Sequence, residues 1–136
     1  MIIVYAYVVG DILHKGHIEA LKNAKALGDK LIVGVLTDEA VMELKQKPTV
    51  GFEERFDIVR SLSFVDCVVA QKDYSPYKNA SKIKPDILAE SDSHDYEPEF
   101  YDAIRQLGIR VVSFPYFPGH SSTEIKNKVR EETNGV

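Results

Sequence analysis

The residues best suited to do chemistry lie near the N-terminus, where His14 and His17 stand three positions apart with Gly16 between them. They follow an apolar run, Ile2–Val9, and they open a segment with helical spacing, which predicts a strand, a tight loop and a helix start. Such a junction gathers unpaired backbone N–H groups and the positive end of a helix dipole, so it suits an anion. We therefore expect the loop from Val8 to His17 to hold a nucleotide phosphate while a bond to it is made or broken.

Alternating strands and helices must position this loop. Five runs rich in apolar and β-branched residues predict strands: Ile2–Val9, Lys30–Leu36, Asp66–Ala70, Asp86–Ala89 and Ile109–Phe114. Four further segments have helical character: His17–Leu27, Phe52–Leu62, Glu97–Leu107 and Ser121–Glu132. The alternation predicts a single α/β domain over residues 1–136, a doubly wound parallel sheet of five strands with helices on both faces. Ligands of such sheets bind beyond the C-terminal ends of the strands, where the first loop is expected.

Composition narrows the possible partners. The net charge of −4 argues against a non-specific nucleic-acid surface, which needs an excess of Lys and Arg. No apolar run reaches the roughly 18 residues of a membrane span, so no membrane partner is expected. The single cysteine, Cys67, fits a reducing, cytoplasmic compartment. Because Cys67 lies inside the apolar run Val65–Ala70, we interpret it as core packing and not as a nucleophile.

The loop can now be compared with known motifs. His14-x-Gly16-His17 resembles the H-x-G-H signature of the nucleotidyltransferase superfamily, and the whole chain looks most like the small cytidylyltransferases that act on glycerol phosphate. Further landmarks of that family follow in order: Thr37-Asp38-Glu39, Phe52-Glu53-Glu54-Arg55, Phe64-Val65-Asp66, Lys84-Pro85-Asp86 and Gly119-His120-Ser121-Ser122-Thr123. Five landmarks in the right order make a chance match very improbable.

The resemblance implies nucleotidyl transfer, in which an oxygen of a small phosphorylated acceptor attacks the α-phosphorus of CTP or ATP and releases pyrophosphate. The protein then has to align the attacking and leaving groups and neutralise charge on the phosphoryl oxygens. His14 and His17 would donate to the triphosphate, and loss of one such donor typically costs about 3 kcal/mol. Mg²⁺ is expected with the triphosphate and no protein metal site is predicted, while a homodimer is expected because small enzymes of this group commonly pair.

The same resemblance assigns the other candidate residues. Arg55 and Lys47 join the two histidines as catalytic residues. The nucleotide is expected to contact Val9, Gly10, Asp11, Gly16, Asp92, His120, Ser121, Ser122 and Thr123. The acceptor is expected to contact Asp11, Asp38 and Asp66. Simpler interpretations stay open: the histidines and Ser121–Thr123 could serve only as helix caps, Arg55 could be a solvated helix arginine, and the aspartates could cap strands or turns.

The chain also departs from the family pattern. The first loop reads Val8-Val9-Gly10-Asp11 where the family has G-T-F-D, so the glycine is displaced by two positions. The loop before the E-x-R helix has Leu44 and Gln46 at the usual lysine positions, with Lys45 and Lys47 beside them. After the fourth strand G-D-D-W becomes Ser91-Asp92-Ser93-His94, and Tyr116 replaces an arginine ahead of the last helix, with His120 as a possible substitute.

With these departures the same class of reaction is still expected, but the identity of the nucleotide and of the acceptor stays open. A cytidylyltransferase is the first hypothesis. The alternatives are adenylyl transfer to a sugar, pantetheine or flavin phosphate, and a nucleotide-binding module with weak or no turnover.

Overall fold

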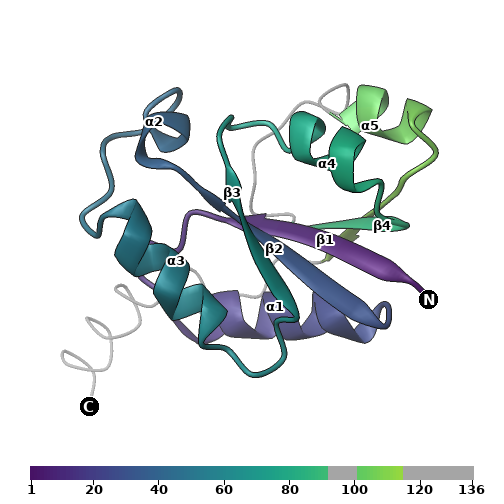
Figure 1. Cartoon of the computed structure of the whole chain (residues 1–136), viewed down its shortest axis with the longest axis horizontal. Helices are drawn as coiled ribbons and strands as arrows, with labels where there is room; N and C mark the ends of the chain where they lie inside the picture. The colour runs from purple at the N-terminus through teal and green to yellow at the C-terminus, as the bar shows by residue number, and fades with distance from the viewer. Residues whose placement is uncertain (92–100, 115–136) are drawn as a thin grey trace, which may run out of the picture.

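The strands form one parallel sheet whose order places the first loop at its centre. A computed structural model describes residues 1–91 and 101–114, and within them lie β1 (Ile3–Val8), β2 (Lys30–Leu36), β3 (Cys67–Gln71), β4 (Ile87–Ser91) and β5 (Arg110–Phe114). They pair in parallel in the order β3-β2-β1-β4-β5. The chain therefore reverses its direction of winding between β1 and β4, and the C-terminal end of β1 lies at this switch point (Figure 1).

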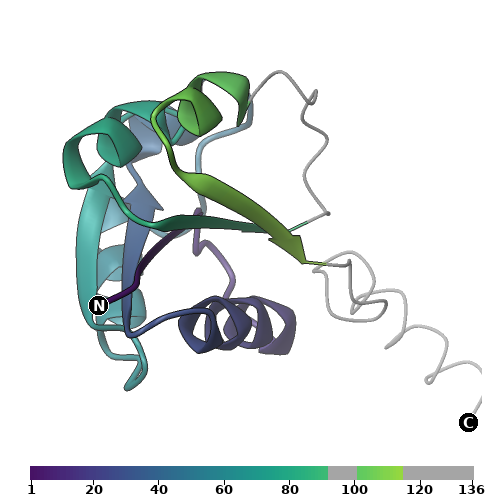
Figure 2. The same ribbon diagram turned by 90° about the vertical axis from the view of Figure 1, so that its right-hand side faces the viewer.

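Helices cover both faces of the sheet, as Figures 1 and 2 show. On one face, α1 (Lys15–Ala26) and α3 (Phe52–Arg60) pack through Leu21, Ala24 and Val59 against alternate residues of β1 and β2. The other face carries three short helices: α2 (Asp38–Val41), α4 (Tyr77–Ile83) and α5 (Asp102–Gln106). The predicted fold class is confirmed. Helices cover both faces of the sheet, which is why the strands have apolar residues at successive positions.

Most predicted elements appear with shifts of a few residues at their ends. The short helices α2 and α4 were not predicted, because seven residues or fewer carry too little periodicity to be seen in the sequence. The predicted helix Glu97–Leu107 is described only from residue 101 onward, where α5 occupies Asp102–Gln106. The predicted helix Ser121–Glu132 lies outside the described residues.

The interpretation of Cys67 as a core residue is wrong. Its side chain is exposed, because it begins β3, the strand at one edge of the sheet, where an apolar run need not be covered. In the parts of the chain that the structure describes, no helix is long and apolar enough to cross a membrane.

Candidate active site

The β1–α1 loop turns sharply before the two histidines. Gly10 adopts a left-handed backbone with φ of 74°, a conformation that favours glycine, and the chain then runs into α1 with His14 as the N-cap. The Gly16 N–H donates to Nδ1 of His14 at 3.0 Å. The His14 N–H donates to Nδ1 of His17 at 3.3 Å, so the two side chains form a reciprocal capping box.

This capping box fixes the tautomer of both imidazoles. A backbone N–H can donate only to a ring nitrogen that carries no proton, so Nδ1 of His14 and of His17 are both acceptors. In a neutral ring the proton then resides on Nε2. The ring centroids lie 4.0 Å apart, so the two imidazoles are neighbours at the first turn of α1. Capping and phosphate binding are therefore compatible roles, since they use opposite nitrogens.

Asp11 connects this loop to the segment that precedes α3. Its carboxylate oxygens accept hydrogen bonds from the backbone N–H groups of Thr49 and Val50, at 3.1 and 2.8 Å. Asp11 is thus more than a turn residue of its own loop, because it holds a segment 38 and 39 residues away in the sequence. Its expected contacts with the nucleotide and the acceptor stay predictions.

Arg55 lies fully buried at the centre of this region. Its Nε donates to the Val50 carbonyl at 2.9 Å, and its Nη1 donates to the carbonyls of Val9 and Leu36. Nη2 forms an ion pair with Asp38 at 2.6 Å. The interpretation of Arg55 as a solvated helix residue is excluded by its burial. In this arrangement the guanidinium contacts the loops and not the surface where a phosphate would arrive, so its predicted contact with substrate stays untested.

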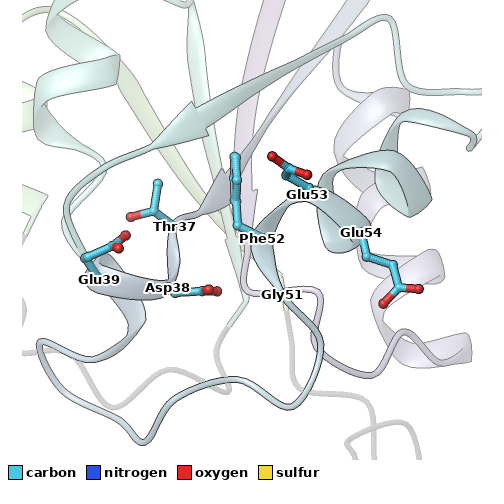
Figure 3. Close-up of a pocket in the computed structure, with 7 residues that line it drawn as sticks. All are labelled: Thr37, Asp38, Glu39, Gly51, Phe52, Glu53 and Glu54. Carbon is cyan, nitrogen blue, oxygen red and sulfur yellow. The ribbon is translucent and has the colours of Figure 1, made fainter.

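A cavity of about 540 Å³ opens beside Asp38, between the starts of α2 and α3 (Figure 3). Its walls carry the carboxylates of both helix starts, one hydroxyl and one aromatic ring: Thr37, Asp38, Glu39, Gly51, Phe52, Glu53 and Glu54. The Thr37 hydroxyl already caps α2 by accepting from the Ala40 N–H at 3.1 Å. An acidic lining repels phosphate, so this cavity suits a neutral part of a ligand with hydroxyl or amino hydrogens to donate.

The predicted lysines lie on the segment between α2 and α3. Lys47 is exposed, and the ammonium of Lys45 stands 5.9 Å from the centre of the Tyr74 ring. Asp11 holds the downstream end of this segment at Thr49 and Val50, and the catalytic role of Lys47 stays a prediction. Several other predicted residues lie outside the described residues: Asp92, Tyr116, His120, Ser121, Ser122 and Thr123.

Asp66 does not join the other predicted residues. It precedes β3 and so lies at the N-terminal ends of the strands, whereas the β1–α1 loop lies at their C-terminal ends. Its carboxylate pairs with Lys25 at 2.6 Å. The same carboxylate accepts from the Leu31 N–H at 2.8 Å. The hydrogen bond from Lys25, and next the one from Leu31, hold the pKa of Asp66 below its usual range. In this structure Asp66 links α1 to the starts of β2 and β3, and its contact with the acceptor stays a prediction that these contacts do not favour.

One buried carboxylate was missed in the sequence. Glu90, near the end of β4, is almost fully buried and accepts hydrogen bonds from the hydroxyls of Tyr7 and Tyr101. Tyr7 lies on β1, so this group crosses the switch point between β1 and β4. An acidic residue directly after the apolar run Ile87–Ala89 was the available signal, but the predicted strand ended one residue before it.

The described residues give no protein metal site. In residues 1–91 and 101–114, no three His, Cys, Asp or Glu side chains are grouped so as to hold a metal ion. Mg²⁺ therefore stays a prediction that rests on the triphosphate and not on this part of the protein.

Comparison with known proteins places this geometry in a family. The model of the family described as cytidylyltransferase-like matches residues 10–128. The chain belongs to this family. The match covers the β1–α1 loop from Gly10 onward, Arg55 and the strands β2 to β5. It confirms the expected membership of the nucleotidyltransferase superfamily, whereas it does not decide between CTP and ATP.

Relatives are similar in sequence to nearly the whole of this chain. The bifunctional protein HldE of Pelobacter propionicus is 35% identical over 126 residues, which is 89% of this chain and 25% of that protein. HldE of Granulibacter bethesdensis is 38% identical over 124 residues, 88% of this chain and again 25% of the relative. The chain thus spans about a quarter of the length of these relatives.

Solved structures extend the comparison. The lipopolysaccharide core biosynthesis protein of Thermoplasma volcanium superposes with a TM-score of 0.76 at 32% identity, covering 86% of this chain and 97% of that one. A pantoate–β-alanine ligase from Francisella tularensis, at 20% identity and a TM-score of 0.60 over 93% of this chain and 65% of that one, shares the fold.

Proposed function

We propose that this protein transfers an adenylyl group from ATP to a phosphorylated sugar and releases pyrophosphate. The observation that carries the proposal is the pair of histidines at the start of α1. Each Nδ1 is held by a backbone N–H, so each ring offers Nε2–H as a hydrogen-bond donor. Two such donors at a helix N-terminus, at the switch point of a parallel sheet, suit the phosphates of a nucleoside triphosphate.

The reaction requires positioning and charge stabilisation, and it requires no protein nucleophile. A phosphate oxygen of the acceptor forms the new bond to the α-phosphorus, and the bond from that phosphorus to the bridging oxygen of the β-phosphate breaks. Pyrophosphate leaves with the electron pair of that bond. His14 and His17 would stabilise the negative charge on the phosphoryl oxygens by donating from Nε2. Donors that are already oriented need no rearrangement when the charge develops, which is why they accelerate the reaction.

Two observations favour a sugar as the acceptor. The cavity between α2 and α3 presents carboxylates that accept from hydroxyl groups and an aromatic ring, Phe52, that can pack against the C–H face of a sugar. The solved relative from Thermoplasma volcanium is a lipopolysaccharide core biosynthesis protein, and such cores are built from sugars. The acceptor's phosphate would then lie outside the acidic cavity, toward the histidines.

The choice of ATP rests on the sequence at and after the last residue of β4. There the family's G-D-D-W reads Ser91-Asp92-Ser93-His94, so the residues expected to recognise cytosine are largely replaced. Adenylyl transfer is therefore favoured over the cytidylyl transfer that the sequence first indicated. Transfer of CMP to the same class of acceptor is the competing outcome of the test.

The test measures pyrophosphate release with Mg²⁺, with ATP or CTP, and with a panel of sugar 1-phosphates, sugar 7-phosphates and glycerol 3-phosphate. We expect turnover with ATP and at least one sugar phosphate. His17→Ala should reduce kcat by about a hundredfold or more. Lys78→Ala is the control, because Lys78 is exposed on α4, and it should turn over at the wild-type rate.

Each other result has a definite meaning. Faster turnover with CTP would replace the nucleotide in the proposal. Micromolar binding of ATP without turnover on the whole panel would favour a binding module. A His17→Ala protein that melts like the wild type and turns over equally fast would overturn the mechanism.

A further inference from the structure

Arg55 contacts both halves of the proposed site from inside the protein. One of its amino groups, Nη1, donates to the carbonyls of Val9, in the β1–α1 loop, and of Leu36, at the end of β2. The other, Nη2, pairs with Asp38, whose carboxylate lines the acidic cavity and is 26% exposed. A single rigid, permanently charged group thus spans the nucleotide loop and the acceptor cavity.

A second set of contacts makes this connection stiff. Nε of Arg55 holds the Val50 carbonyl, and the N–H of the same residue is held by Asp11. Asp11 belongs to the β1–α1 loop, so that loop is tied to the segment before α3 directly, through Asp11, and indirectly, through Arg55. A shift of the guanidinium would therefore move Val9 and Val50 together, because its four acceptors share one planar donor group.

We propose that Arg55 is a positioning residue that couples the acidic cavity to the nucleotide loop, so that changes at the Asp38 carboxylate alter the affinity for the triphosphate. This inference rests on the proposed function for the identity of the two sites. The carboxylate of Asp38 that would accept a hydrogen bond from a ligand hydroxyl is the same carboxylate that orients the guanidinium. The guanidinium in turn sets the Val9 carbonyl, one residue before the turn at Gly10.

Asp38 and its neighbour Glu39 allow a matched comparison. Both lie in the first turn of α2 and both line the cavity, but only Asp38 contacts Arg55. Each carboxylate repels a bound triphosphate, because both are negatively charged. Removal of either one should therefore strengthen nucleotide binding if Coulomb repulsion is the only effect. Coupling through Arg55 predicts the opposite sign for Asp38, because the guanidinium loses the partner that orients it.

The experiment measures the Kd for Mg-ATP, and separately for Mg-CTP, without acceptor, in the wild type and in Asp38→Ala, Asp38→Asn and Glu39→Ala. We expect Asp38→Ala to bind about 5- to 150-fold more weakly, the usual range of coupling between sites. Asp38→Asn, whose amide oxygen can still accept from Nη2, should lie between Asp38→Ala and the wild type. Glu39→Ala should bind as tightly as the wild type or more tightly.

Hydrogen exchange of the nucleotide-free proteins gives a second measurement. In Asp38→Ala the amides of Thr49 and Val50 should exchange faster than in Glu39→Ala, while amides of the central strand β1 remain unchanged. Equal affinities and equal exchange in Asp38→Ala and Glu39→Ala would overturn the coupling. If the wild type binds neither nucleotide, the proposed function fails, and the exchange measurement still decides whether Arg55 positions the loop.

Discussion

Replacement of Arg55 by Met tests whether this arginine is a structural centre of the site or a mobile ligand of phosphate. The change keeps an unbranched side chain of similar length and removes all donors. It leaves the carbonyls of Val9, Leu36 and Val50 and the carboxylate of Asp38 without the guanidinium. Each buried acceptor left unsatisfied costs about 1–3 kcal/mol, and breaking a buried ion pair costs about 3–5 kcal/mol.

These costs are not additive here. Asp38 is 26% exposed and recovers part of its solvation, and Met contributes apolar contacts in place of the guanidinium. We therefore expect Arg55→Met to lower the free energy of unfolding by about 3–5 kcal/mol, a large share of the roughly 5–15 kcal/mol typical of such a domain. Urea unfolding followed by far-ultraviolet circular dichroism measures the change through the midpoint at constant slope.

Arg60 provides the control on the same helix. Its side chain is 66% exposed and pairs with Asp57, itself 63% exposed, so Arg60→Met should cost less than about 1 kcal/mol. If Arg55→Met is as stable as Arg60→Met but loses turnover, Arg55 acts on substrate and the positioning argument is wrong. A comparable loss of stability in both variants would likewise refute the special role of Arg55.

Two further predictions follow from single contacts. The capping box predicts that, in the neutral rings of His14 and His17, ¹⁵N chemical shifts report unprotonated Nδ1 and protonated Nε2, and the opposite tautomer in either ring would contradict the donor geometry. Because the pKa of Asp66 is depressed by Lys25 and the Leu31 N–H, its contribution to stability is present above the usual aspartate pKa of about 4 and is lost as the pH falls through the depressed value. Urea unfolding should therefore show Asp66→Asn to be less stable than the wild type at pH 7, by a difference that shrinks as the pH falls below about 4, and a difference that did not change with pH would exclude this linkage.

The fold could be predicted because the strands and long helices carry periodic apolar patterns. Alternation of strand and helix led to a parallel sheet with helices on both faces, and the sheet has this form. The apolar pattern does not tell which strands lie at the edges of the sheet. Cys67 shows the consequence, because the apolar run of an edge strand has the same sequence pattern as the apolar run of a central strand.

The site was predictable only where its residues follow one another in the chain. His14, Gly16 and His17 form a local motif, and the structure joins them through local backbone contacts. The contacts of Asp11 with Thr49 and Val50 depend on how distant segments meet, and no local spacing indicates them. Asp66 shows the limit of a motif match, because this residue precedes β3 and so lies at the N-terminal ends of the strands, away from the C-terminal ends where the β1–α1 loop lies.

The displaced glycine of the first loop is explained by the backbone and does not signal a lost site. The family's glycine falls at the register of Val8, which here is still a strand residue paired with Val35 of β2. The chain makes its left-handed turn two residues later, at Gly10, where a Cβ would lie 3.6 Å from Cγ2 of Val59. That distance is an ordinary contact, so the backbone conformation and not crowding requires glycine.

The later turn also determines which backbone groups face the interior. The strand continues up to the residue before Val9, and the Val9 carbonyl meets the Arg55 guanidinium while the following residue reverses the chain. The histidines begin α1 four residues further on and are held by contacts within their own turn. The displacement therefore alters the backbone of the loop proposed to hold the nucleotide and leaves the two histidine caps in place, which is the combination expected of a nucleotidyltransferase fold adapted to a different substrate.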